Sequence, residues 1–262
     1  MRNVFAIIKK ELYSYFFSPI IWVVFSVFLL IEGWMFFTLV GRFSAEYAYF
    51  MQQRAMNPSM GAMFNVNARI IAPLLGNTSV VLLLLMPTLT MRLLAEEHDN
   101  GTMELLLTRP VTVSQLVLGK YFASLIVLAM MLTCTMLYPL ILSIYGTLDL
   151  GPVYSAYLVT FLVGASFLAF GLFASACTTS QIIAAIVGFG GNLFFWMISW
   201  ASGAIGDEWR TVSKIIDHLS IPGHFENGIK GVFSSVDIIY YVSFVAFFLF
   251  MTHRVIDSTR WR

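Results

Sequence analysis

Charged residues and cysteines are both scarce in this chain. Only 11% of its 262 residues are charged, whereas 59% are hydrophobic, and the mean hydropathy is +0.82. Soluble globular proteins average about 25% charged residues, so this composition excludes most soluble enzymes, a nucleic-acid-binding domain and an intrinsically disordered chain. The net charge of +1 gives no reason to expect a polyanionic partner such as nucleic acid. Two cysteines cannot form a disulfide scaffold.

The common motifs of nucleotide, metal and hydrolase sites are also missing. The chain has no G-x-x-x-x-G-K-[ST] phosphate loop, so any ATP must be bound by another protein. It has no H-E-x-x-H, C-x-x-C or G-x-S-x-G pattern, and its four histidines show no recognisable ligand spacing. We therefore expect no catalytic residue, no metal site and no cofactor bound by this chain.

Long apolar runs are what the sequence has in abundance. A helix needs about 20 mostly apolar residues to cross a membrane. Six runs reach or approach this length: 20–40, 70–91, 116–142, 153–177, 182–205 and 238–252. They predict an all-α integral membrane protein with six transmembrane helices in a single domain, residues 1–262. The side that carries both termini has nine of the fifteen Lys and Arg residues, which places it in the cytoplasm by the positive-inside rule.

Residues 1–18 precede the first apolar run and are amphipathic. At 100° per residue, most of their apolar side chains fall within one arc of about 120°. These side chains are Val4, Phe5, Ile8, Leu12, Tyr15 and Phe16. The pattern predicts a helix that lies in the membrane interface and is ended by Ser18-Pro19. The alternative is a basic segment that only sets topology.

The loop between the second and third runs, residues 92–115, is rich in charge for this chain. Its charged residues include Arg92, Glu96, Glu97, Asp99 and Glu104. Asn100-Gly101 predicts a turn. Thr102 can then cap a short helix that Pro110 ends. A short, charged helix between two spans is suited to transmitting force from a soluble domain.

A second segment with turn signals, residues 206–235, separates the fifth and sixth runs. It contains a candidate short helix at 209–218, then Ile221-Pro222-Gly223 and a second apolar stretch. Two short helices around a Pro-Gly turn predict an outer hairpin that re-enters the membrane or lies on its surface. Irregular backbone at membrane depth must then pack against protein rather than lipid.

The charged loop also carries a family pattern. Residues 97–111, EHDNGTMELLLTRPV, followed by Gly119-Lys120, resemble the E-x-x-x-G-T-x-E-x-L-x-x-x-P-V pattern of ABC-2 type exporter permeases. Within that family, the stretch 219–250 and the basic end 260–262 resemble the gliding-motility-associated permeases, which are grouped with permeases linked to multicopper-enzyme maturation. The amphipathic start, the six spans and the outer hairpin also fit the family.

The resemblance implies a permease subunit of the bacterial inner membrane that pairs with a second copy of itself. A separate ABC ATPase would bind ATP and Mg²⁺ and dock on the cytoplasmic loop, and this subgroup adds a membrane-anchored accessory subunit. The docking residues that match the motif are Glu96, Glu97, Asp99, Gly101, Thr102, Glu104 and Leu105. The alternative for the acids is a solvated loop face. The sequence leaves open whether ATP drives export of a substrate or a mechanical signal to the accessory partner.

Three polar residues interrupt the apolar runs: Glu32, Asn77 and Asn192. Ionisable groups inside a membrane are functional candidates by default, so we expect Glu32 to line a substrate path or to contact another subunit. Asn77 and Asn192 are the other candidates for this path. Interhelical hydrogen bonding is the simpler alternative for both asparagines.

Four methionines cluster between the first two runs: Met51, Met56, Met60 and Met63. Thioethers are soft ligands that suit Cu(I). A methionine stripe is more often a packing surface, so copper binding is the weaker hypothesis.

Two other classes of function remain. A stand-alone secondary transporter would show internal repeats or several acids in its spans. A membrane enzyme would need convergent polar groups. The sequence shows neither pattern.

Overall fold

The computed structural model describes residues 2–56, 65–101, 112–146, 148–204, 218, 220–232 and 234–259. These residues form helices and no strands. Six helical segments among them are long and apolar enough to cross a membrane: Pro19–Met56, Asn67–Asp99, Val113–Tyr145, Leu150–Ala176, Gln181–Ser199 and Ser235–Ser258. The protein is therefore an all-α integral membrane protein, as the sequence predicts.

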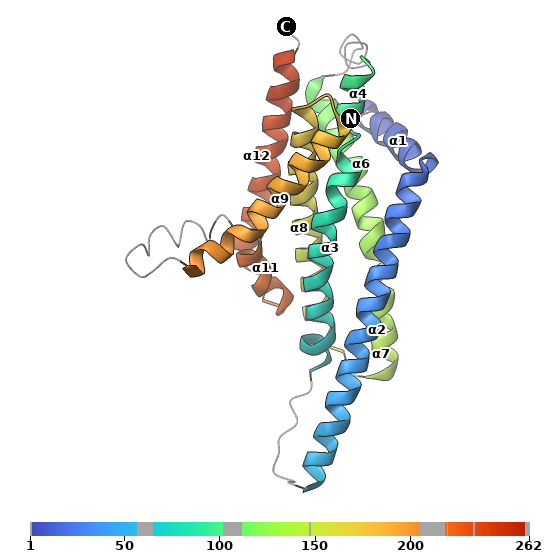
Figure 1. The fold of residues 1–262 in the computed structure, drawn as a ribbon, viewed down its shortest axis with the longest axis vertical. Coiled ribbons are helices and arrows are strands. Elements are labelled where there is room, and N and C mark those ends of the chain that lie inside the picture. Colours follow the sequence, from blue (N-terminus) through green and yellow to red (C-terminus); the bar gives the residue numbers. More distant parts are fainter. Residues whose placement is uncertain are drawn as a thin grey trace.

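Both ends of the chain lie at the same end of the helix bundle (Figure 1). The first helix, α1 (Arg2–Phe17), is found there, together with the last turns of α12 (Ser235–Thr259). The short helix α4 (Ala95–Asp99), which ends the second of these segments, lies at this end too. We call it the terminal end. Six spans return the chain to the side on which it started, which explains why the termini share it.

The helix at the centre of the bundle is α8 (Leu150–Ala176), the most buried span. Four spans pack against it: α3 (Ala72–Thr90), α6 (Val113–Thr135), α9 (Gln181–Ala204) and α12. A Cβ atom on Gly164 would lie 2.7 Å from the side chain of Leu128. One on Gly171 would overlap the hydroxyl of Thr90. Glycine at these positions lets spanning helices approach closely, which increases van der Waals contact between them.

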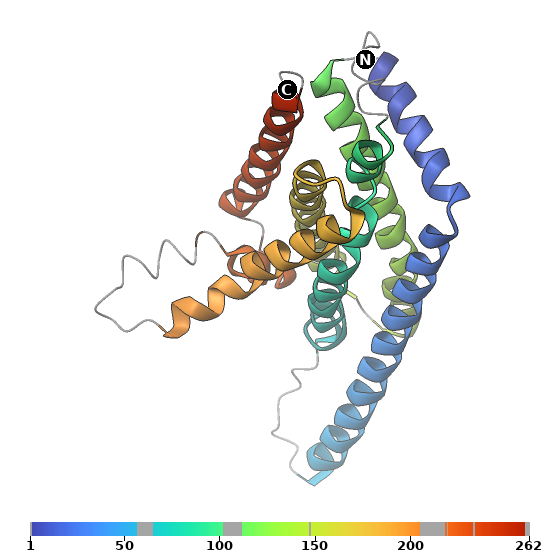
Figure 2. The same cartoon turned by 45° about the horizontal axis from the view of Figure 1, so that its top comes forward.

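The longest helix of the described chain is α2 (Pro19–Met56), with 38 residues. At 1.5 Å per residue it measures about 57 Å, well beyond the roughly 30 Å of a bilayer's hydrocarbon core. Its second half projects past the other spans, at the end opposite the termini (Figures 1 and 2). There Glu46 lies 3.3 Å from Arg69, which belongs to η1 (Asn67–Ile71), the short π-helix that begins the second span.

The third span is divided between α6 and α7 (Leu137–Tyr145). Pro139 has no N–H to donate to the carbonyl of Thr135, four residues earlier, and the helix is interrupted there. The hydroxyl of Tyr157 on α8 donates to this carbonyl at 2.9 Å. The sequence predicts a span over 116–142 with Pro139 near its end, and the structure has one candidate span here, Val113–Tyr145. Within it the helix breaks, and a neighbouring helix satisfies the freed backbone acceptor.

The amphipathic helix predicted for residues 1–18 is present as α1, but it has two distinct apolar faces. Phe5, Tyr13 and Phe17 are exposed, which suits the membrane interface. Leu12 and Tyr15, which the sequence assigns to a membrane-facing arc, pack against the protein core. The helix therefore contacts both the bundle and its surroundings.

Between the fifth and sixth spans lies α11 (Ile221–Ile229), which packs against α8 and α9. Ser220 caps it, and Pro222 occupies its first turn, where the missing N–H would have no helical partner anyway. The predicted Pro-Gly turn at 221–223 is therefore wrong, because these residues begin a helix. The preceding part of the predicted hairpin, 206–217, lies outside the described residues.

Polar contacts hold α11 against its neighbours. Nδ1 of His224 lies 2.6 Å from Oδ1 of Asp237 at the start of α12. The ring of Tyr240 stacks on His224, with 4.2 Å between the ring centroids. The hydroxyl of Ser155 on α8 donates to the carbonyl of Gly228 at 2.9 Å. This helix is thus packed against protein, as a re-entrant segment requires.

Candidate functional site

The charged loop, residues 92–115, contains α4, a helix of five residues. Its N-cap residue, Leu94, has no side chain that accepts the free N–H groups of the first turn. Ser175, at the end of α8, supplies the acceptor: its Oγ accepts from Leu94 N at 3.1 Å and from Ala95 N at 3.0 Å. The same hydroxyl donates to the carbonyl of Met91 at 3.1 Å. Ser175 therefore fixes the start of α4 to α8.

Four charged side chains meet where α1, α4 and α6 converge. We call them the ion quartet: Lys10, Glu11, Glu97 and Lys120. Nζ of Lys120 donates to Oε1 of Glu11 at 3.1 Å and to Oε1 of Glu97 at 2.8 Å. Nζ of Lys10 donates to the same two oxygens, at 2.9 and 3.3 Å. Because Lys120 is only 1% exposed, its charge is compensated by these carboxylates rather than by water.

The pKa values of Glu11 and Lys10 are both shifted in favour of the charged forms. Burial acts to raise the pKa of Glu11, but the ammonium groups of Lys120 and Lys10 outweigh it and hold this pKa below its ordinary value of 4.5. Burial acts to lower the pKa of Lys10, but Glu11 and Glu97 raise it above its ordinary value of 10.5. Glu11 and Lys10 are therefore both charged at neutral pH.

The backbone of α6 lies close to α1 at Gly119, next to Lys120. A Cβ atom on Gly119 would lie 2.7 Å from Cγ2 of Ile7, closer than van der Waals contact allows. Glycine at this position lets α1 approach α6. Glu11 follows Ile7 by one helical turn, so the same approach brings its carboxylate to Lys120.

Arg92 connects the junction of α1 and α2 to α4. Its Nη1 donates to Oγ of Ser18 at 3.2 Å, and its Nε lies 3.3 Å from Oε2 of Glu96. The side chains of Arg92 and Glu96 are 35% and 41% exposed, so their ion pair contributes at most about 1 kcal/mol. The contact orients the α1–α2 junction relative to α4 and adds little to the free energy of unfolding.

The predicted docking residues that the structure describes differ in their surroundings. Asp99 is exposed and Glu96 is partly exposed, whereas the carboxylate of Glu97 belongs to the ion quartet. Gly101 has a φ of +65° and ends α4, so the predicted Asn100-Gly101 turn is confirmed. The other three docking residues lie outside the described residues: Thr102, Glu104 and Leu105.

Lys10, Glu11, Lys120 and Ser175 are not among the predicted docking or path residues, although Gly119-Lys120 accompanies the family pattern. A signal for two of them exists. Glu11 interrupts the apolar face of a helix at the membrane interface, and Lys120 lies in an apolar run near the same side of the membrane. Opposite charges on two buried faces favour a pair, because neither is stable there alone. Ser175 has no such signal, since it is one of many hydroxyl residues in the spans.

The polar residues predicted to line a path make separate contacts. Glu32 on α2 is fully buried, and its Oε2 accepts from Oγ1 of Thr78 on α3 at 3.0 Å. Asn192 on α9 is 1% exposed, and its Nδ2 lies 3.4 Å from the carbonyl of Phe167. Asn77 is exposed on the surface of α3. Within the described part of a single chain, no hydrogen bond joins any two of the three candidates.

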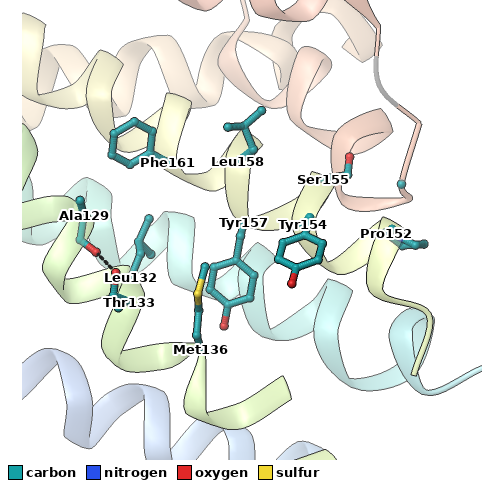
Figure 3. A pocket seen from close by; sticks show the side chains of 12 residues that line it. Ala129, Leu132, Thr133, Met136, Pro152, Tyr154, Ser155, Tyr157, Leu158 and Phe161 are labelled. Carbon is teal, nitrogen blue, oxygen red and sulfur yellow. Dashed lines mark hydrogen bonds between the residues drawn. The ribbon is translucent and has the colours of Figure 1, made fainter. Parts of the chain in front are cut away.

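A cavity of about 710 Å³ lies between α6, α8 and the turn that follows α11 (Figure 3). Its walls are mainly apolar and include Leu132, Met136, Leu158 and Phe161. Tyr157 also lines it, and its hydroxyl already donates to the carbonyl of Thr135. None of Glu32, Asn77 and Asn192 contributes to these walls. The lining favours apolar groups over polar ligands.

The methionine cluster is only partly described. Met51 and Met56 are exposed on α2, and Met60 and Met63 lie outside the described residues. Among the residues with described positions, no three or more His, Cys, Asp or Glu side chains are grouped to hold a metal ion. The copper hypothesis rests on methionine sulfur and stays a prediction.

Comparison with known families gives a match over nearly the whole chain. The family model described as ABC-2 family transporter protein matches residues 5–252. This range includes most of α1, the charged loop and all or most of each span. Comparison with curated proteins finds none that matches the chain.

Proposed function

This chain belongs to the ABC-2 family of transporter proteins, and we propose that it is the permease subunit of an ATP-driven exporter in the bacterial inner membrane. The family match and the six spans support a permease subunit of an ABC transporter. Export as the direction of transport, and the bacterial inner membrane as its place, rest on the resemblance of the motif at 97–111 to exporter permeases.

The family implies an ABC ATPase as partner. The sequence of this chain has no phosphate loop, so in this proposal ATP and Mg²⁺ are bound by the ATPase, and this chain is a non-catalytic subunit. The observation that carries the proposal is the position of α4. It lies between α3 and α6 in the chain, at the terminal end, and side chains of α1, α6 and α8 hold it. When a helix held in this way is displaced, the displacement is transmitted to the helices that contact it.

The docking surface in this proposal is the exposed side of the loop. Glu96 and Asp99 contact the ATPase directly, and Gly101 gives the chain its turn after α4. Thr102, Glu104 and Leu105 extend the surface, as their match to the motif implies. Glu97 acts within the permease rather than at its surface, because its carboxylate holds α4 in place through the ion quartet.

The terminal end faces the cytoplasm in this proposal, which agrees with its larger share of basic residues. A second copy of the chain completes the transporter. The exposed apolar side chains of α9, among them Ile183, Ile186 and Val187, supply a face that needs a second copy or lipid to cover it. A membrane-anchored accessory subunit rests on the resemblance of residues 219–250 to the gliding-motility-associated group.

Affinity purification from native membranes in mild detergent, followed by mass spectrometry, tests the proposal. We expect an ATPase with a phosphate loop to co-purify with the chain. The double variant Glu96→Lys/Asp99→Lys should lose it, whereas Glu226→Lys, at an exposed acid of α11, should retain it. An intact, homogeneous chain that brings no ATPase would contradict the proposal and favour a secondary transporter or a membrane enzyme.

The alternative within the family is a subunit that signals mechanically to an accessory partner without moving cargo. Reconstitution of the purified complex in vesicles separates the two. ATPase activity stimulated by a transported compound indicates export. ATPase activity that depends on the accessory subunit, without flux of any compound, indicates signalling.

A further inference from the structure

The ion quartet connects the loop helix to two other parts of the protein. We propose that it makes α1, α4 and the start of α6 move as one body, so that ATP-driven displacement of the loop reaches the first span through α1. Lys120 and Glu11 are then positioning residues, which act through Glu97. This inference rests on the proposed function and specifies how the permease takes up the motion of its ATPase.

The quartet is a closed arrangement. The ammonium groups of Lys10 and Lys120 contact the same two oxygens, Oε1 of Glu11 and Oε1 of Glu97, at distances from 2.8 to 3.3 Å. Displacement of Glu97 alone would separate two ion pairs. The pair with Lys10 is the weaker, because that side chain is exposed, whereas Lys120 would keep one carboxylate at a site that water scarcely reaches. Separating charges in such a place costs far more than at a surface. Moving α4 together with α1 avoids that cost.

Packing beside the quartet supports the same unit. Ile7 lies directly against Gly119, without space for a Cβ atom between them, so α1 cannot slide along α6 without a clash. The hydroxyl of Tyr15, one turn after Glu11, donates to the carbonyl of Leu89 at 3.0 Å. These contacts bind α1 to the second and third spans on both sides of the quartet.

The first span receives any movement of α1 through a short junction. α1 ends at Phe17 and α2 begins at Pro19, so only Ser18 separates them. The hydroxyl of Ser18 accepts from Arg92, at the base of the loop. Proline at the start of α2 restricts the backbone dihedral angles of Ser18, which limits the movement of α1 and α2 relative to each other. A shift of α1 therefore displaces the start of α2.

Distances in the purified complex of this chain with its ATPase, in lipid nanodiscs, test the inference. Cys134 and Cys177 are first replaced by serine. Spin labels are then placed in pairs at three exposed positions: Ala6 on α1, Asn100 after α4 and Ser258 on α12. We expect ATP to shift the α1–α12 distance while the α1–α4 distance stays constant.

Three variants separate a coupling role from a merely structural one. Lys120→Met should retain the ATPase but broaden the α1–α4 distances and reduce the ATP-dependent shift of α1 several-fold. The exchange variant Glu11→Lys/Lys120→Glu swaps the two charged groups, so the quartet keeps two ammonium groups and two carboxylates. It should restore the ATP-dependent shift of α1. Lys9→Met, at the neighbouring exposed lysine, should behave as the unmodified chain. If Lys120→Met does not fold, Glu11→Gln takes its place with the same expectation.

Three results would overturn the inference. The first is a normal ATP-dependent shift of α1 in Lys120→Met, and the second is an α1 that does not move while α4 moves in the unmodified complex. The third is a Glu11→Lys/Lys120→Glu variant that folds and binds the ATPase but does not recover the shift of α1. Failure of the proposed function looks different, because no ATPase then co-purifies. The isolated chain still tests the quartet in that case. If Lys120→Met has α1–α4 distances no broader than those of Lys9→Met, the quartet does not hold the two helices together.

Discussion

Two buried carboxylates, those of Glu11 and Glu32, are accommodated in different ways. Glu11 lies at the terminal end and shares one oxygen between two ammonium groups. Glu32 lies within the first span and accepts a hydrogen bond from the hydroxyl of Thr78, with no salt bridge among the described residues. The carboxylate of Glu11 is thus stabilised by positive charge, and that of Glu32 by the dipole of a hydroxyl group.

The difference determines what each site can do. The quartet resists separation, because removal of Lys120 leaves carboxylates in a buried place with only the exposed ammonium group of Lys10 beside them. It can therefore hold separate helices together under load. A hydrogen bond between a carboxyl and a hydroxyl joins α2 to α3 much less firmly. The first arrangement suits transmission of force, and the second suits a local contact between spans.

The largest expected effect follows from breaking the quartet. Lys120→Met leaves the carboxylates of Glu11 and Glu97 with only Lys10, and we expect the free energy of unfolding to fall by about 3–5 kcal/mol. Thermal unfolding in detergent measures this change. The matched control, Lys9→Met, removes an exposed ammonium group and should change stability by less than about 0.5 kcal/mol. Equal losses in the two variants would show that Lys120 contributes no more than a surface charge.

A steric change near the quartet sharpens the comparison, because it leaves every charge in place. Gly119→Ala puts a Cβ atom 2.7 Å from Cγ2 of Ile7, and we expect it to cost about 2 kcal/mol through strain at the α1–α6 contact. Ile7→Ala removes Cγ2 and Cδ1 but keeps Cβ, which would lie 2.9 Å from the new Cβ atom, so it relieves part of the clash. The double variant should therefore lose less stability than the sum of the two single variants. Strict additivity in thermal unfolding would argue against the close contact.

The sequence predicts the spans better than it predicts the contacts between them. Six apolar runs and the Asn100-Gly101 turn are local features, and the structure contains both. The Pro-Gly turn at 221–223 is wrong because proline also fits the first turn of a helix, and Ser220 supplies the cap that decides between the two. Likewise, Pro139 marks the break in the third span, but its position does not reveal that Tyr157 satisfies the freed carbonyl.

The candidate site depends on contacts between residues that are distant in the sequence. Glu97 is visible as a charged loop residue, but its partners come from the first helix and the third span. The motif assigns it to docking, whereas the structure also gives it an internal role. Ser175 reaches the start of α4 from the far end of α8. Local periodicity carries no information about such pairs, apart from the unexpected charges of Glu11 and Lys120 in apolar surroundings.

A smaller effect is expected inside the first span. Thr78→Val leaves Oε2 of Glu32 buried without its hydroxyl donor, which should cost about 1 kcal/mol. Glu32→Gln retains an oxygen that accepts from Thr78, so its cost should be lower still. Thermal unfolding measures both. If Glu32→Gln also leaves assembly and ATP-dependent function intact, Glu32 does not serve a substrate path through its charge.

The smallest effect is the acid response of the quartet. The pKa of Glu11 is lower in the folded protein than its ordinary value of 4.5, so its contribution to stability is complete above pH 4.5 and is lost as the pH falls through the folded value. Glu11→Gln has no such group. We expect the difference in unfolding temperature between the unmodified chain and Glu11→Gln to be constant near neutral pH and to shrink below pH 4.5. A difference that persists unchanged at acid pH would mean that the carboxylate of Glu11 stabilises the fold by its shape rather than by its charge.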